Sequence, residues 1–169
     1  MEILVDHSGN GEYKEAPNDD QPLKFELSEA DVNEIFALAD KLGHFSRPLE
    51  SPAKVAFMGM KTYRFESGSE KHEVKFNFSE DLDARLLQDW FERIAETERL
   101  LINLERAAKY DKLGVNDALL LVQVSFDHKR LVAPQQLLPM LDRVAKNETY
   151  MHMARLRAAA LADAIRAGK

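Results

Sequence analysis

The feature that most constrains this chain is a run of about 28 residues with helical periodicity, which starts near Ser79. Three acidic residues follow Ser79 in the first turn, where negative charge favours the helix dipole. We therefore predict one long helix capped by Ser79, about 42 Å long at 1.5 Å per residue. Its buried stripe is predicted to comprise Leu82, Leu86, Trp90, Ile94, Thr97, Leu101, Leu104 and Ala108.

The long helix carries more apolar residues than a single stripe requires. A helix that is apolar around much of its circumference is covered on several sides. We expect the cover to come from the helices that follow in the chain, or else from a second copy or another partner. The predicted interaction surface consists of Leu87, Phe91, Leu100 and Ile102.

The residues before the long helix are dominated by strand patterns. "EILV" and "GEYKE" predict an opening hairpin over residues 2–15, and "LKFEL" alternates with period two over residues 23–27. Residues 54–79 predict a second hairpin that turns at "SGSE", with a bulge or kink at Gly59. One helix interrupts these strands over residues 29–42.

Residues that begin and end helices lie on both sides of the helix 29–42, and further helices are predicted after the long helix. Ser28 precedes the first helix as an N-cap and Gly43 follows it as a stop. Residues 115–128 fit a strand or a helix, and Asn116 as a cap favours the helix. Two further helices are predicted, one with Pro134 or Pro139 in its first turn and one that runs from Asn147 to Gly168.

These elements predict an α+β fold. A small antiparallel β-sheet, built from two hairpins plus a strand, packs with one helix over residues 1–78. A helical C-terminal half led by the long helix follows over residues 79–169 and shares one core with the first part.

The composition excludes several classes of site. The 169 residues include no cysteine, which excludes disulfides, thiolate zinc sites and cysteine nucleophiles. No apolar run approaches the roughly 20 residues of a membrane span, and the N-terminus lacks a signal-peptide pattern. We expect a soluble protein, cytoplasmic by default and exported if a leader has been removed.

Charge is unevenly distributed along the chain. Residues 1–42 hold 3 Lys or Arg against 11 Asp or Glu, whereas residues 143–169 hold 6 against 2. The basic end lacks interleaved aromatic residues and the acidic end would repel phosphates. Nucleic acid is therefore not expected as a partner.

The fragment "VDHSGNGEYKE", residues 5–15, has acidic and polar residues at alternate positions, as a calcium loop does. The bidentate acid that an EF-hand needs at its twelfth position is replaced by Pro17. Asn10-Gly11 instead predicts a hairpin turn. Exposed calcium binding by Asp6, Asn10 and Glu12 is the alternative.

No other pattern points to a metal, a cofactor or catalysis. The five histidines (His7, His44, His72, His128 and His152) show no metal-ligand spacing. Glu92 and Glu96 lie one helical turn apart, as an acid/base pair would, but a solvated ion-pair face explains them better. We expect no cofactor. An enzyme would have to assemble its site from scattered residues such as Tyr63, Arg64, His72 and Glu73.

The order of "VDHSGNGEY", "FELSEADVNEIFALADKL" and the aromatic hairpin resembles small uncharacterised bacterial proteins, many of them exported. The resemblance covers roughly residues 3–78 and implies no activity. We hypothesise a bacterial, non-enzymatic binding or assembly module whose partner is another protein or a second copy, joined through the long helix or a sheet edge. The alternatives are the enzyme and an inhibitor or accessory subunit of a larger protein.

Overall fold

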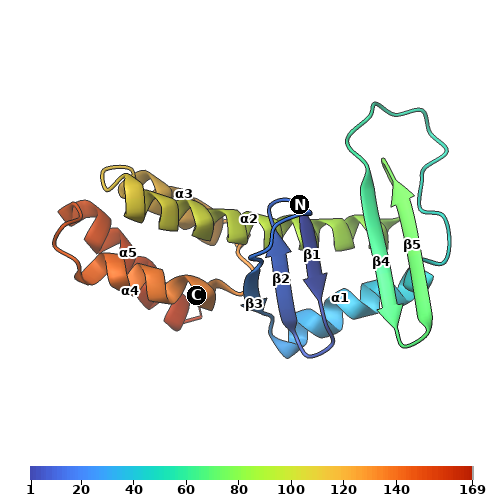
Figure 1. Cartoon of the computed structure of the whole chain (residues 1–169), viewed down its shortest axis with the longest axis horizontal. Helices are drawn as coiled ribbons and strands as arrows, with labels where there is room; N and C mark the ends of the chain where they lie inside the picture. The colour runs from blue at the N-terminus through green and yellow to red at the C-terminus, as the bar shows by residue number, and fades with distance from the viewer. Residues whose placement is uncertain (169) are drawn as a thin grey trace. The chain divides into compact units, whose positions relative to one another are not determined.

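The computed structural model describes residues 1–168, in which five strands and five α-helices are present (Figure 1). The α+β fold class is confirmed. The chain forms two compact units, Ser28–Glu92 and a first unit that joins Met1–Leu27 to the residues from Arg93 onward. The predicted boundary near residue 78 marks the change from strands to helices.

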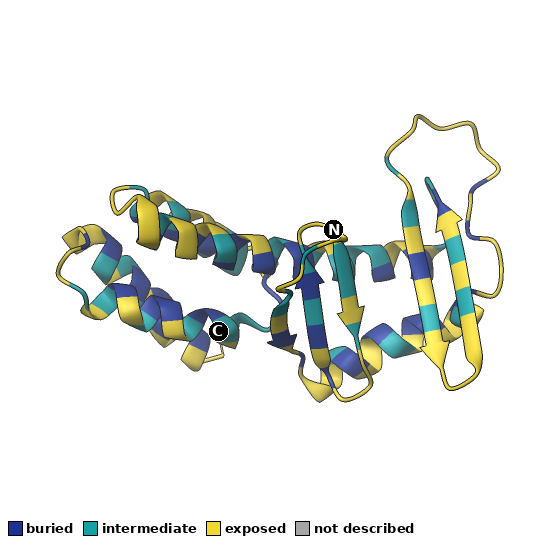
Figure 2. Ribbon diagram, in the orientation of Figure 1, coloured by how far each residue is buried: buried dark blue, intermediate teal, exposed yellow. Residues whose placement is uncertain are grey.

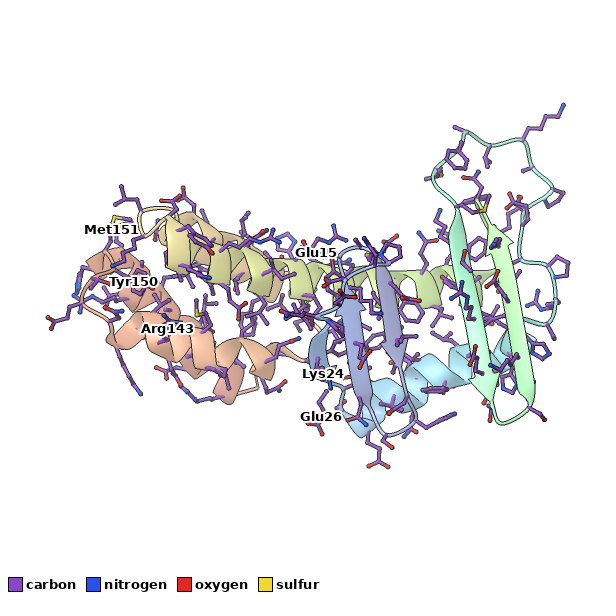
Figure 3. All side chains as sticks on the ribbon, in the orientation of Figure 1. Glu15, Lys24, Glu26, Arg143, Tyr150 and Met151 are labelled. Carbon is purple, nitrogen blue, oxygen red and sulfur yellow. The ribbon has the colours of Figure 1, made fainter. Side chains whose placement is uncertain are left out.

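The first unit contains a three-stranded antiparallel sheet in the order β1 (Glu2–Val5), β2 (Asn10–Lys14), β3 (Leu23–Glu26). Its side chains alternate as the period of two requires. On β3, Lys24 and Glu26 are exposed (Figure 3), and Phe25 between them is buried.

The turn of the opening hairpin does not fall at Asn10-Gly11, so this part of the prediction is wrong. Both residues lie in β2, and the turn is formed by the preceding four residues. The carboxylate of Asp6 accepts the backbone N–H groups of Ser8 (2.8 Å) and Asn10 (2.9 Å), which organises a longer loop. Gly9 supplies the positive φ, at 87°.

The helices of the first unit follow the sheet. They are α2 (Leu82–Tyr110) from Arg93 onward, α3 (Val115–Asp127), α4 (Leu138–Lys146) and α5 (His152–Arg166). A short 3-10 helix, η2 (Pro134–Leu137), precedes α4. One hydrophobic cluster joins all of them and includes Leu104, Leu119, Leu137, Leu141 and Ala158.

Two predicted helix caps in this unit are wrong. Helix α3 begins at Val115 with Gly114 as its N-cap, so Asn116 already lies inside it. Helix α5 begins at His152 with Met151 as its N-cap, because the Asn147 side chain accepts the N–H of Thr149 in a local turn instead. The Asn116 and Asn147 side chains therefore accept hydrogen bonds from other groups and do not cap these helices.

The second unit is centred on Tyr63. It comprises α1 (Glu29–Lys41), the short helix η1 (Gly43–Phe45), the hairpin of β4 (Lys61–Ser67) and β5 (Glu70–Phe76), and the first turns of α2. The Tyr63 hydroxyl donates to the Ala84 carbonyl at 3.3 Å, and burial raises its pKa. Its ring contacts the rings of Phe45, Phe76 and Phe91.

The start of α2 differs from the prediction. The helix begins at Leu82, and the Asp81 carboxylate, not the Ser79 hydroxyl, accepts the N–H groups of its first turn. Leu82 and Leu86 are 65% and 46% exposed, so the predicted stripe is wrong at both positions. Ala84 and Leu87 are buried in their place, and the Ala84 carbonyl accepts the hydrogen bond from the Tyr63 hydroxyl.

Gly59 does not form a bulge within a strand, as β4 begins only at Lys61. Its φ of 99° belongs to the loop before the strand. The cap at Ser28 is present, since its hydroxyl accepts the Asp31 N–H at 3.2 Å.

The Gly11→Ala substitution is expected to lower the free energy of unfolding by about 1–3 kcal/mol, as overpacking does. Gly11 pairs with Phe25 on the neighbouring strand, and a Cβ at position 11 would overlap the Phe25 ring. Urea unfolding would measure the loss. The loss should shrink in a Phe25→Leu background, and an equal loss in both backgrounds would contradict this explanation.

Candidate functional site: a groove between α3 and α5

A groove of about 380 Å³ lies between α3 and α5 of the first unit. Its lining is mostly apolar. Helix α3 contributes Gln123, Phe126 and Asp127, and α5 contributes Met153, Leu156, Arg157, Ala160, Leu161 and Ala164.

The helical period sets which side chains line the groove. On α5, Ala154, Ala158 and Ala162 recur every four residues and are buried, which leaves Met153 and Leu156 on the adjacent face. Leu156 is 57% exposed. The face of α5 turned away from the core is therefore apolar where it lines the groove.

Arg157 ties α5 to α3 within the groove. Its Nε donates to Gln123 Oε1 at 3.1 Å, and its Nη1 donates to the carbonyl (3.1 Å) and the side-chain oxygen (2.6 Å) of Asn116. The half-buried guanidinium thus has its partners within the unit. Asn116, predicted as a cap, serves this contact instead.

Helix α3 also carries exposed apolar residues outside the lining of the groove. Leu120 lies three residues before Gln123 and thus on the same side of the helix, and Leu121 and Val124 are also exposed. Figure 2 shows several exposed stretches along α3. Exposed apolar side chains next to a groove make this face a candidate for contact with another protein. We call the groove and Leu120 together the groove face.

A second unusual group in the first unit is the carboxyl of Glu98, which lies on α2 and is 0% exposed. Neither oxygen has a hydrogen-bond partner of good geometry, nor does either polar atom of the Gln136 side chain on η2. Burial raises the pKa of Glu98 to about 7, although the nearby Gln136 amide lowers it in part. The charged form is therefore disfavoured.

The residues near Glu98 are tightly held. The adjacent Thr97 hydroxyl donates to the Arg93 carbonyl (3.0 Å) and accepts the Val132 N–H (3.0 Å), which fixes the chain before η2 on α2. Tyr13 is also buried, and desolvation raises its pKa more than Arg99 lowers it. The Glu98 side chain is fully buried, so the energy of its charged form bears directly on the stability of the fold.

Glu98 is expected to make the protein less stable as the pH rises from 4.5 to about 7. Its pKa is about 7 when folded and 4.5 ordinarily, so the folded form binds the proton more tightly. The contribution of Glu98 to the free energy of unfolding is thus highest below pH 4.5, and the part of it lost by pH 7 is about 3 kcal/mol.

Chemical denaturation of the Glu98→Gln variant between pH 4 and pH 8 tests this prediction. The variant should show a flatter pH dependence and greater stability than the wild type at pH 8. Glu105→Gln, an exposed change on the same helix, is the control. An unchanged slope in Glu98→Gln would contradict the assignment.

The residues predicted for calcium lie in and beside the first hairpin. The Asp6 carboxylate accepts three hydrogen bonds, including one from the Asn10 side chain (3.0 Å), and Glu12 lies in β2. Within residues 1–168, no three His, Asp or Glu side chains are grouped so that they could hold a metal ion.

The predicted interaction surface is partly buried. Leu87 is almost fully buried in the second unit, and Leu100 belongs to the hydrophobic cluster of the first. Phe91 and Ile102 are half-buried. Leu100 is covered by helices of the same chain. The role of Phe91 and Ile102 in contact with a partner remains a prediction.

The residues named for an assembled enzyme site lie on two faces of one hairpin. Tyr63 pairs with Val74 in register, and Arg64 pairs with Glu73, with which it also forms an ion pair. Adjacent strand residues point to opposite faces, so Tyr63 and the Arg64–Glu73 pair are separated. His72 Nδ1 contacts the His44 carbonyl at 3.2 Å.

Glu92 and Glu96 also have local partners. Glu92 is exposed and accepts from the Gln88 side chain at 2.6 Å. Glu96 accepts from the Ser125 hydroxyl (2.7 Å) and pairs with Arg130 (3.2 Å). Each carboxylate therefore binds side chains of its own compact unit, and the two do not act on a common group.

The position of Glu98 in the sequence indicates its burial, although the predicted stripe did not include it. Glu98 lies four residues after Ile94 and three before Leu101, both in the predicted buried stripe. An acidic residue at such a position is a candidate for burial. The groove face had no comparable signal, because it depends on which helices become neighbours.

No family model, no curated protein and no solved structure matches this chain. Among the described helices, none has the length and apolar character that crossing a lipid bilayer requires.

Proposed function

We propose that this protein is a non-enzymatic assembly module that associates through its groove face with a second copy of itself. The observation that carries the proposal is the mostly apolar groove between α3 and α5, with exposed Leu156 in its lining and exposed Leu120 on the same side of α3 as Gln123. Burial of apolar side chains between two chains is favourable.

The charges of the two helices favour a second copy as the partner. Helix α3 carries two Asp and no Lys or Arg, whereas α5 carries three Arg and one Asp. Opposite charges beside one apolar groove suit a contact between two copies of the same chain. Such complementarity selects the partner and speeds association more than it adds affinity.

The groove also suits a protein segment better than a small polar substrate. Arg157 Nε already donates to Gln123 Oε1 at 3.1 Å, so these two groups are engaged with each other and not with a ligand. What the groove offers to a partner is chiefly apolar surface from Phe126, Met153 and Leu156.

Sedimentation velocity over a wide concentration range tests the proposal. The wild-type protein should self-associate, and Leu156→Arg should raise the dissociation constant by at least about tenfold, or 1.4 kcal/mol, since the new charge would be desolvated. Leu156 is exposed, so the substitution leaves the core intact.

Leu113→Arg is the matched control, because Leu113 is 73% exposed and lies in the turn before α3. It should associate like the wild type. A wild-type protein that remains monomeric at every attainable concentration would refute the proposal, as would equal effects of the two substitutions.

A further inference from the structure

A loop in the second unit, residues 52–60, exposes apolar side chains to solvent. Phe57 is 76% and Met58 66% exposed, and Val55 and Met60 are also exposed. Figure 2 shows the segment that leads into β4 as exposed along most of its length, and Figure 1 shows it extending past the start of that strand. Solvent exposure of Phe and Met side chains is unfavourable unless another surface covers them.

The loop has a fixed backbone, because Asn77 binds it on both sides of Phe57. The Asn77 side-chain oxygen accepts the Met58 N–H at 2.6 Å, and its Nδ2 donates to the Ala56 carbonyl at 3.1 Å. The Asn77 carbonyl accepts from Lys61 Nζ at 2.6 Å. Phe57 is therefore held between two anchored residues.

The beginning of the loop is anchored as well. The Ser51 N–H donates to the Phe78 carbonyl at 2.8 Å, and the Ser51 hydroxyl accepts the Ala53 N–H at 3.0 Å. The Glu50 carboxylate accepts the backbone N–H of Asn77. A loop ordered in advance loses little conformational entropy when it binds, which favours its use as a contact element.

We infer that Phe57 and Met58 of one copy bind in the α3–α5 groove of another, so that copies join head to tail. This inference rests on the proposed function, since it specifies what fills the groove. The chain thus carries both an ordered apolar projection and an apolar groove. Complementary surfaces at different places on one molecule generate such heterologous contacts.

The chemistry of the groove fits this occupant. Apolar side chains that enter the groove of about 380 Å³ would release water from its mostly apolar lining. Met153 in the groove and Met58 in the loop are flexible and adapt to irregular surfaces. The aromatic ring of Phe57 supplies the largest apolar area at the centre of the contact.

Charge at the edge of the contact is also complementary. Lys54 lies three residues before Phe57 in the loop, and Asp127 lies at the groove, where it is exposed. A loop seated with Phe57 in the groove can bring these opposite charges together at the rim. Rim charges of this kind favour the correct pairing over alternatives.

A complementation experiment tests the inference. Phe57→Ser removes the projection and leaves the groove, whereas Leu156→Arg blocks the groove and leaves the projection. Each variant alone should be monomeric by sedimentation velocity under conditions in which the wild type associates. Their mixture should form a one-to-one dimer, because the loop of the Leu156→Arg protein still fits the groove of the Phe57→Ser protein.

Controls and outcomes separate this inference from the proposed function. Leu86→Ser, an exposed apolar change on α2, should associate like the wild type, and circular dichroism should show that all variants are folded. Association of Phe57→Ser at the wild-type level overturns the loop contact but leaves groove-mediated assembly standing. A mixture that stays monomeric also overturns it, since the two surfaces would then not bind each other.

A lipid surface is the alternative partner for this loop, because its apolar side chains are flanked by Lys54 and Lys61. Flotation with vesicles of zwitterionic and anionic lipids distinguishes it. The head-to-tail contact predicts no vesicle binding that depends on Phe57. Vesicle binding lost in Phe57→Ser, together with unchanged self-association, would overturn the inference.

Discussion

Helix α2 supplies buried side chains to both compact units, and this requirement constrains the sequence along its whole length. Ala84 and Leu87 are buried in the unit Ser28–Glu92, and Leu101 and Leu104 are buried in the other. Full burial of one leucine contributes about 1.5–3 kcal/mol. A substitution in either half of the helix therefore acts first on the stability of the unit that the residue serves, although both halves belong to one continuous helix.

The fold class could be predicted because the patterns on which it depends are local. Alternation along β3 and the helical period of α2 and α5 follow from neighbouring residues. The errors in the helix caps occur where a polar residue has a choice of partners. Ser79 and Asn147 have the chemistry of N-caps, but Asp81 caps α2 and Asn147 binds Thr149. At Gly11, glycine is required by the approach of the Phe25 ring and not by a turn, which no single-strand pattern reveals.

The candidate site was much less predictable than the fold. The groove exists because α5 packs beside α3 across about 25 intervening residues, and sequence periodicity does not specify which helices become neighbours. The sequence did indicate that the long helix is covered on several sides, and Leu100 is indeed covered by helices of the same chain. The exposure of Phe57 depends on Asn77, a residue 20 positions later that resembles any other loop asparagine.

The loop that presents Phe57 depends in turn on the hairpin that follows it. A two-stranded hairpin alone is marginally stable in water, so β4 and β5 need support. The His44 ring stacks on Phe65 with centroids 4.0 Å apart, and its nitrogens contact Asp40 (2.7 Å) and Glu70 (3.2 Å). These carboxylates raise the pKa of His44, so the stabilisation is complete below the ordinary histidine pKa and is lost as the pH rises through the raised value. The hairpin, whose strand β5 ends next to Asn77, should therefore lose this support from His44 as the pH rises through the raised pKa.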